Sequence, residues 1–325
     1  MQDSSNSMAG TICLVTGATT GIGLVTAREL AARGATVVIV GRSRERCEAA
    51  VETIKRQTGN EGVEFIVADL SSQADVRRAA SEFLARHNRL HVLINNAGAM
   101  FALRRESVDG IEMTLALNHL AYFLLTDLLL DTIKASAPAR IVNVSSGAHD
   151  DVKAFDFEDP QALSKRRGYG QSEFKSLLST LTTPWAHPGF MQYAQTKLAN
   201  LLFTYELARR LEGTGVTVNA LHPGFVSTGF TGGNGSFGWF MRVWSRLLGM
   251  NAEDGARTTL HVACTLEVEG VTGKYFVKQK VAESSAASRD VEAAGRLWKV
   301  SEGWVAGTFR RKEASALSPQ RGDGV

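Results

Sequence analysis

The stretch VTGATTGIG, from Val15 to Gly23, has the residue types and spacing of a loop that binds phosphate. Gly17 permits a tight turn, and Gly21 and Gly23 permit close approach of a pyrophosphate and of the following helix to the strand. A helix that begins here would present free N–H groups and the positive end of its dipole to the phosphates. The Gly-Lys-Ser/Thr ending of an ATPase loop is missing. The loop therefore favours a dinucleotide, with a plain strand-to-helix connection as the alternative.

The stretch GRSRERC, from Gly41 to Cys47, bears on which nicotinamide cofactor such a site would take. A site for NAD usually offers an acidic residue to the ribose hydroxyls after the second strand. An acid would repel a 2′-phosphate, whereas the guanidinium of Arg42 can pair with one. The sequence therefore favours NADP(H). NAD(H) stays open, because a solvated helix start with scattered charge would give the same pattern.

The elements that must position these loops alternate between strand and helix patterns. Apolar runs rich in β-branched residues cover 11–17, 36–41, 63–70, 90–98, 139–146, 216–224 and 273–277. Helical patterns cover 23–34, 43–59, 110–136 and 191–212, and another lies between the third and fourth strands. Continuous apolar strands that alternate with helices indicate a parallel sheet covered on both faces. Right-handed crossovers then give a doubly wound sheet.

We therefore predict one α/β domain of the Rossmann type, with a doubly wound parallel sheet of about seven strands and helices on both faces. The domain is expected to span residues 10–308. Residues 1–9 are expected to form a flexible N-terminus, and the polar tail 309–325 is expected to be disordered.

The charge balance argues against a nucleic-acid partner. The formal net charge is only +3, and Lys and Arg are spread among Asp and Glu. We find no basic stripe with interleaved aromatic residues, which nucleic-acid binding would favour.

The cysteines bear on metal binding and on the compartment. Cys13, Cys47 and Cys264 have no metal-ligand spacing, so we expect no metal site. Their odd number and scatter suggest reduced thiols, and we expect a cytoplasmic protein.

No membrane-spanning segment is expected from the sequence. The N-terminus, MQDSSNSMAG, is polar and lacks the apolar core of a signal peptide. We expect no apolar run long enough to cross a bilayer as a helix. The nearest, FLLTDLLL from Phe123 to Leu130, is interrupted by Asp127 and is interpreted as a buried amphipathic helix. Peripheral contact with a membrane stays open.

Six motifs occur in one order along the chain. They are TGATTGIG at 16–23, NNAG at 95–98, LNHLAYFLLT at 117–126, IVNVSS at 141–146, YAQTK at 193–197 and HPGFVST at 222–228. This ordered set resembles the short-chain dehydrogenases/reductases, and within them the retinol-dehydrogenase-like branch. The resemblance covers residues 10–303, and the combination of motifs is far more specific than any single one.

The resemblance implies a catalytic set of Ser146, Tyr193, Lys197 and Asn118. Tyr193 would donate a proton to the substrate oxygen in reduction and remove it in oxidation, although a free tyrosine, with a pKa of ~10, is poorly matched to neutral pH. Lys197 lies one helical turn further on, and its ammonium, with the oxidised nicotinamide, would favour the phenolate. Ser146 would hydrogen-bond the substrate oxygen, while the neighbouring Ser145 side chain should point to the other face. Asn118 would support a water chain to Lys197.

The resemblance also implies which residues contact the cofactor. The expected set is Gly17, Thr19, Thr20, Gly21, Ile22, Gly23, Arg42, Ser43, Arg46, Asp69, Leu70, Asn95, Ala97, Gly98, Tyr193, Lys197, Pro223, Gly224, Val226 and Thr228. Asp69 has a second interpretation, as a cap of the following helix. His119 and His222 lie beside site residues, and we interpret both as structural.

The chain departs from the family pattern between Ser146 and Tyr193, which lie 47 positions apart. This gap is much shorter in most members of the family, so residues 148–189 form an insertion. Long insertions are often lids or binding loops. Its apolar residues at near-helical spacing would form a substrate cover or a subunit contact, or simply a packed surface helix; they are Phe174, Leu177, Leu178, Leu181 and Trp185.

A second apolar stretch, GSFGWFMRVWSRLLGM, lies where the family has substrate-binding helices. Its large side chains could line an apolar pocket or face a membrane or a second subunit; they are Phe237, Trp239, Phe240, Met241 and Trp244.

The leading hypothesis is an NADP(H)-dependent oxidoreductase for a carbonyl or alcohol of a bulky apolar molecule, such as a retinoid, steroid or lipid. A reductase of carbon–carbon double bonds, like the protochlorophyllide-reductase-like relatives, would use similar Tyr and Lys residues. A non-catalytic nucleotide-binding scaffold is the alternative from another class. The resemblance also leads us to expect a homo-oligomer, either a dimer or a tetramer.

Overall fold

The computed structural model describes residues 7–163, 188–224 and 251–307. Its sheet has eight strands in the order β3-β2-β1-β4-β5-β6-β7-β8. The strands are β1 Ile12–Thr16, β2 Thr36–Gly41, β3 Val63–Val67, β4 Val92–Asn95, β5 Ala139–Val144, β6 Val216–His222, β7 Tyr275–Val277 and β8 Lys280–Ala282. All neighbours pair in parallel except β7 and β8. The predicted α/β class and doubly wound sheet are confirmed.

The strand count of about seven needs one correction, because β8 adds an antiparallel edge. Lys278 and Gln279 connect β7 to β8, and both have positive φ, 49° and 65°. A two-residue hairpin turn with positive φ is usually marked by Asn-Gly or Asp-Gly, whereas this turn is Lys278-Gln279. The strand itself is short and largely exposed, so no apolar run marks it.

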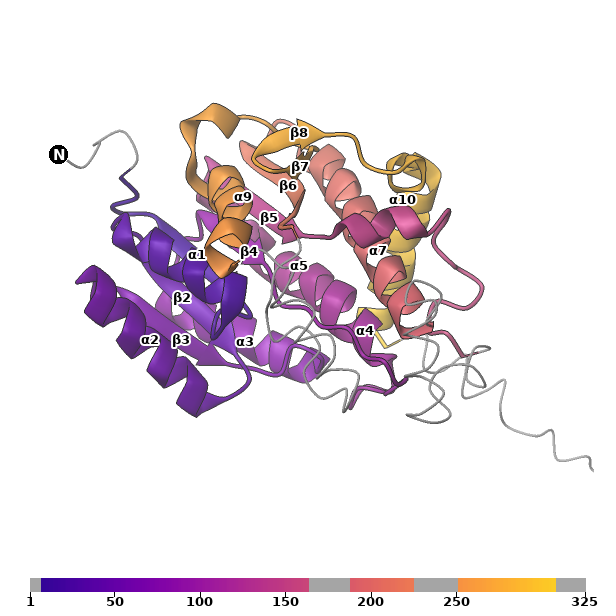
Figure 1. Cartoon of the computed structure of the whole chain (residues 1–325), viewed down its shortest axis with the longest axis horizontal. Helices are drawn as coiled ribbons and strands as arrows, with labels where there is room; N and C mark the ends of the chain where they lie inside the picture. Colours follow the sequence, from indigo (N-terminus) through magenta and orange to yellow (C-terminus); the bar gives the residue numbers. More distant parts are fainter. Residues whose placement is uncertain (1–6, 164–187, 225–250, 308–325) are drawn as a thin grey trace, which may run out of the picture.

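Helices cover both faces of the sheet (Figure 1). The long ones are α1 Gly21–Ala32, α2 Arg44–Thr58, α3 Gln73–Arg86, α5 Ala121–Ala135, α7 Pro188–Arg210, α9 Ala252–Cys264 and α10 Val291–Val305. Shorter ones are α4 Met113–Leu115, η2 Ala116–Leu120, η3 Gly147–Asp151, η7 Leu266–Val268 and η8 Ala286–Arg289. Figure 1 shows α1 beside α9 and α7 beside α10, and the two pairs pack against opposite faces of the sheet.

The strands divide their side chains between two apolar cores, as alternation along a strand requires. Leu14, Val38 and Val40 face the core under α3, α5 and α7. Cys13 and Val15 face the opposite core, under α1, α2 and α9. Because both faces are apolar, the strands appear in the sequence as continuous apolar runs.

The run from Met113 to Ala135 is a continuous helix made of α4, the π-helical turn η2 and α5. Contrary to our expectation, it is long and apolar enough to cross a membrane by length and composition. However, 72% of its most apolar window is buried inside the fold, as in the core helix of a globular domain. The predicted buried helix around Asp127 is therefore part of this element.

The helix α10 covers the outer side of α5 and α7. The ring of Trp298 lies 5.0 Å from that of Phe123 and 5.9 Å from that of Phe203, measured between centroids. The guanidinium of Arg210 lies 4.0 Å above the same indole. An apolar surface on these two helices is thus covered by the chain itself.

Several expectations concern residues at the ends of the described ranges. Met8 is buried and its N–H donates to the Arg33 carbonyl oxygen at 2.8 Å, so the fold begins slightly before residue 10. The expected tail 309–325 and the apolar groups around Phe174 and Trp239 lie outside the described residues.

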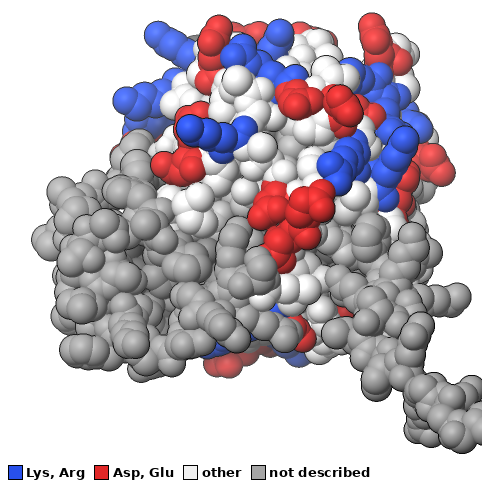
Figure 2. All heavy atoms as spheres, turned by 90° about the vertical axis from the view of Figure 1, so that its right-hand side faces the viewer, with Lys and Arg blue, Asp and Glu red and all other residues white. Residues whose placement is uncertain are grey.

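Figure 2 shows the face at the α10 end of the molecule. Lys and Arg are intermixed with Asp and Glu over its described part, and no continuous basic stripe is visible there.

Candidate active site

The carboxyl ends of β1 and β4 meet where the direction of strand order reverses. The chain leaves β1 toward β2 and leaves β4 toward β5, so the following loops diverge and open a crevice between them. Thr16, at the end of β1, binds the two ends together. Its Oγ1 accepts hydrogen bonds from the N–H groups of Asn96 and Ala97, at 2.9 and 3.0 Å.

The glycine loop lies in this crevice in a form that only glycine allows. Gly17 has φ +66°, and a Cβ there would lie 2.8 Å from the Cα of Ala97. A Cβ on Gly23 would lie 2.5 Å from the carbonyl oxygen of Gly17. A side chain at either position would therefore collide with backbone, and the loop would move away from its strand.

The N-terminus of α1 is open toward a ligand. Thr20 is its N-cap residue, but its side chain makes no capping hydrogen bond, and the first turn holds no acid. By contrast α2, α3, α9 and α10 are each capped by a side chain, from Ser43, Ser72, Asn251 and Asp290. Free N–H groups and the dipole at α1 suit a phosphate, so the cradle fits a dinucleotide.

Two exposed cations follow the end of β2, the strand next to β1. Arg42 and Arg46 are exposed, and neither forms an ion pair with another described residue. Arg44 lies between them in sequence but pairs with Glu48 at 3.6 Å. The hydroxyl of Ser43 accepts from the N–H of Arg46 at 3.3 Å and caps α2.

Two residues expected to contact a cofactor have side chains that face the core instead. Asn95 is fully buried, and its Nδ2 donates to Thr126 Oγ1 at 3.0 Å and Asn143 Oδ1 at 2.9 Å. Leu70 belongs to the core under α3 and α5. Both side chains are therefore excluded from the crevice, and only their backbone could meet a ligand.

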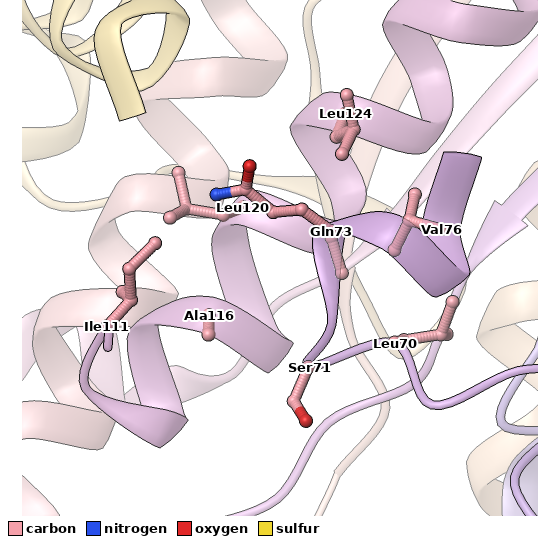
Figure 3. Close-up of a pocket in the computed structure, with 9 residues that line it drawn as sticks. Leu70, Ser71, Gln73, Val76, Ile111, Ala116, Leu120 and Leu124 are labelled. Carbon is pink, nitrogen blue, oxygen red and sulfur yellow. The ribbon is translucent and has the colours of Figure 1, made fainter. Parts of the chain in front are cut away.

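The side chain of Leu70 helps to line the small pocket in Figure 3, between α3 and the helix from Met113 to Ala135. The volume is about 10 Å³, barely enough for one water molecule, and the lining is mostly aliphatic. This pocket is a packing defect and does not qualify as a ligand site.

Asp69 closes the turn before α3. Its Oδ1 accepts hydrogen bonds from the N–H and the hydroxyl of Ser71, at 3.0 and 2.8 Å. The cap of α3 is Ser72, not Asp69. The interpretation of Asp69 as the cap of α3 is therefore wrong, although its carboxylate does stabilise the turn before that helix.

The catalytic residues implied by the family motifs come together where α7 crosses the end of β5. The Nζ of Lys197 lies 5.5 Å from the ring centroid of Tyr193 and donates to the carbonyl oxygen of Val144 at 3.0 Å. Ser145 points away, as expected, and its hydroxyl donates to the carbonyl oxygen of Lys197 at 2.8 Å. The Ser146 side chain lies close enough to Tyr193 to lower the pKa of the phenol, and its hydroxyl also accepts from the N–H of Ala148 at 3.3 Å.

Asn118 braces this arrangement from the π-helical turn η2. Its Oδ1 accepts from the N–H of Ala99, and its Nδ2 donates to Thr196 Oγ1 at 3.1 Å. A Cβ on Gly98 would lie 3.2 Å from Asn118 Oδ1 and 3.6 Å from Lys197 Nζ. Because Gly98 has no side chain, the amide of Asn118 and the ammonium of Lys197 both face the space beside it.

Burial dominates the protonation of the tyrosine and lysine. It raises the pKa of Tyr193 above its ordinary value, and the hydrogen bond from Ser146 opposes only part of that shift. Burial also lowers the pKa of Lys197 to about 7. Without a bound nicotinamide, Tyr193 therefore holds its proton, and the expected effect of the ammonium together with the oxidised nicotinamide stays a prediction.

His119 and His222 have lost the ability to carry charge at neutral pH. Burial lowers the pKa of each to about 4. The Nε2 of His119 lies 2.8 Å from the hydroxyl of Ser301, inside the core.

Among the described residues, no group of His, Cys, Asp and Glu is arranged to hold a metal ion.

The family can be identified from comparisons with known proteins. A family model described as short chain dehydrogenase matches residues 11–155. Retinol dehydrogenase 12 of Homo sapiens is 42% identical over 295 residues, which cover 90% of this chain and 86% of that protein. The chain belongs to the short-chain dehydrogenase family. It is therefore an oxidoreductase, and the predicted retinol-dehydrogenase-like branch is confirmed.

Other members of the family support this assignment. Retinol dehydrogenase 13 of Homo sapiens is 39% identical and covers 91% of this chain and 84% of its own length. The crystal structure of an uncharacterized protein from Mycobacterium paratuberculosis has a TM-score of 0.70 and 32% identity over 93% of this chain and 95% of its own. A short chain dehydrogenase from Burkholderia cenocepacia J2315, in complex with NADP, has a TM-score of 0.62 and 26% identity over 83% of this chain and 97% of its own.

Sequence reasoning missed Glu112, a buried carboxylate of this dehydrogenase. It accepts hydrogen bonds from the N–H groups of Thr114 and Leu115, at 2.9 and 2.8 Å, and from Gln192 Nε2 at 3.1 Å. Burial raises the pKa of Glu112, and these hydrogen bonds oppose the shift. The signal available was an acidic residue directly before an apolar helix, which is typical of a cap.

The glutamines on either side of Tyr193 were missed as well. Gln192 Nε2 donates to the carbonyl oxygen of Pro160, and Gln195 Nε2 donates to that of Ala154, at 3.0 and 3.1 Å. The described part of the insertion therefore lies along α7, next to Tyr193. Val226 and Thr228 lie outside the described residues, and Pro223 and Gly224 end the described part of that segment.

The pKa of Lys197 predicts how reduction of a carbonyl should depend on pH. Below pH about 7 the ammonium is charged and can stabilise the phenolate that Tyr193 leaves behind, so kcat/KM should be constant there and fall as the pH rises above it. The raised pKa of Tyr193 keeps that group protonated throughout. The measurement is kcat/KM for a reducible carbonyl between pH 5 and roughly 10, the ordinary pKa range of lysine.

The control is Lys197→Arg, whose guanidinium stays charged over this range. The fall above pH about 7 should disappear or move upward in this variant. An unchanged profile would assign the titration to another group.

Proposed function

We propose that this dehydrogenase uses NADP(H) to interconvert a carbonyl and an alcohol on a bulky apolar substrate, such as a retinoid, steroid or lipid. The contact of Tyr193 with Ser146 and Lys197 at the end of β5 carries this proposal. The relatives named retinol dehydrogenases support the substrate class, and the NADP complex of a neighbouring structure supports the cofactor.

The described residues divide the work of reduction among themselves. Tyr193 holds the proton and donates it to the substrate oxygen, while Ser146 hydrogen-bonds that oxygen and stabilises its developing charge. Lys197 then stabilises the phenolate. NADPH, when bound, would supply the hydride. In oxidation the same groups act in reverse, and Tyr193 accepts the proton.

The preference for NADP(H) follows from charge beside the glycine loop. A Cβ on Gly41 would lie 2.5 Å from Thr19 Cγ2, so the loop packs directly against the end of β2. Arg42 follows Gly41 at once and has no acidic partner among the described residues. A 2′-phosphate at this position would give the guanidinium a bidentate partner.

The protein is proposed to work in a reducing, cytoplasm-like compartment. Cys13, Cys47 and Cys264 are all free thiols, and two of them are buried. Burial raises the pKa of Cys47, so its thiol stays protonated and unreactive.

Replacing Tyr193 tests the mechanism. Tyr193→Phe removes the hydroxyl and little volume, so turnover should fall by at least ~100-fold, the usual contribution of a general acid. NADPH affinity should persist, because the ring remains. Both are measured on one preparation, by steady-state kinetics and by fluorescence titration. Near-normal turnover in this variant would remove Tyr193 from the mechanism.

Replacing Arg42 tests the cofactor preference. Arg42→Ala should weaken NADPH binding by about 1.5–3 kcal/mol, roughly 10- to 150-fold, the usual worth of a hydrogen bond to a charged group. NADH affinity should change little. Arg44→Ala is the matched control, because that guanidinium already pairs with Glu48. Equal losses for NADPH and NADH, or equal effects of both variants, would show that Arg42 does not discriminate.

A further inference from the structure

His149 has a single possible tautomer in this structure. Its side chain is fully buried, with Nδ1 2.7 Å from the carbonyl oxygen of Ser146 and Nε2 3.1 Å from the backbone nitrogen of Ser285. A carbonyl oxygen can only accept a hydrogen bond, and a backbone N–H can only donate one. Nδ1 therefore carries the hydrogen and Nε2 offers its lone pair, so the imidazole is neutral.

The nearby carboxylate does not change this assignment. Asp150 Oδ1 lies 3.3 Å from the same Nε2, on a largely exposed side chain. An ionised carboxylate is an acceptor only, so it cannot bond to a bare lone pair. Ser285 N–H is the partner that fits.

The imidazole connects two parts of the chain that are 136 positions apart in sequence. On one side is Ser146, whose carbonyl also accepts from the backbone N–H of His149 at 3.3 Å. On the other side is Ser285, the N-cap of η8, which follows β8. The ring also packs against that of Tyr275 of β7 in a T-shaped pair, with 5.1 Å between centroids.

The segment around Ser285 is itself fixed to α7. The hydroxyls of Tyr205 and Ser284 lie 2.7 Å apart, and Ser288 Oγ donates to Ser284 Oγ at 2.7 Å. The segment that contains Ser285 is therefore held on the helix that also carries Tyr193 and Lys197. Figure 1 shows β7 and β8 next to α7.

We propose that His149 is the positioning residue for Ser146. It holds the backbone of Ser146 through Nδ1, so that the serine hydroxyl faces Tyr193 and the substrate oxygen. Ser285 N–H sets the tautomer that makes this bond available, because it occupies Nε2. Residues 280–289, which include β8 and η8, thereby help to position Ser146 without touching the substrate. This role rests on the proposed function.

Two substitutions separate the two bonds of the imidazole. The amide of asparagine lies as many bonds from Cβ as Nδ1 does, and the amide of glutamine as many as Nε2. His149→Asn can therefore keep a donor to the Ser146 carbonyl and lose the link to Ser285. His149→Gln can accept from Ser285 N–H and loses the bond to Ser146. Each variant removes one buried hydrogen bond, so a purely structural role would affect both alike.

The test compares kcat, KM, NADPH affinity and melting temperature in the two variants. His149→Gln should lower kcat roughly 10- to 100-fold, as expected for a displaced hydrogen-bond donor, with NADPH affinity unchanged. His149→Asn should stay within about threefold of the parent, since the donor to Ser146 persists. If glutamine is not accommodated, His149→Ala replaces it, and asparagine must then restore the turnover that alanine loses.

Equal losses of kcat in both variants, no loss in either, or a loss confined to His149→Asn would overturn the proposal. A parent protein that reduces no carbonyl would instead refute the proposed function. The two failures are distinguishable, because the first requires an active parent and the second excludes one.

Discussion

The burial of Lys197 is the constraint on which the site depends. An ammonium removed from water is costly unless a polar group meets it. Here the carbonyl oxygen of Val144 accepts from Nζ at 3.0 Å, and the rings of Tyr122 and Tyr193 lie 5.9 and 5.5 Å away. The carbonyl belongs to the sheet and the ammonium to α7, so the charge is tolerated only when the two elements are docked in one register.

The contacts that fix this register are the ones that shape the catalytic group. Ser145 donates to the backbone of α7 from the end of β5, and Asn118 connects the loop after β4 to Thr196. Glu112 reaches the same helix through Gln192. Fold stability and the position of Tyr193 therefore depend on one set of buried polar groups. At the crevice, by contrast, α1 begins without a side-chain cap and leaves its N–H groups for a ligand.

Much of the fold was predictable from sequence because the strands are apolar on both faces and glycines mark the crevice. The burial of the strands on both faces also concealed the orientation of Asn95. A strand buried on both sides has no polar alternation to show which face a side chain takes, and Asn95 turned toward Thr126 and Asn143. Lys278 and Gln279 form the last hairpin without any turn signal.

The missed polar residues have partners that are remote in the sequence. Glu112 meets Gln192, 80 positions away, and His149 meets Ser285, 136 positions away. Each residue alone has an ordinary local interpretation, as a helix cap or a polar loop residue. Only the folded chain shows that both are buried and fully bonded beside Tyr193 and Ser146.

The central claim is hydride transfer to a carbonyl carbon, and isotope transfer tests it most directly. NADPH deuterated at the transferable position is incubated with the protein and a panel of apolar α,β-unsaturated aldehydes and ketones, and the products are analysed by mass spectrometry and NMR. Hydride transfer to the carbonyl carbon should give an unsaturated alcohol with one deuterium on the carbinol carbon. Deuterium at the β-carbon of a saturated carbonyl product would show a double-bond reductase. Binding of NADPH without transfer to any member of the panel would show a nucleotide-binding scaffold, and either result would contradict carbonyl reduction by this protein.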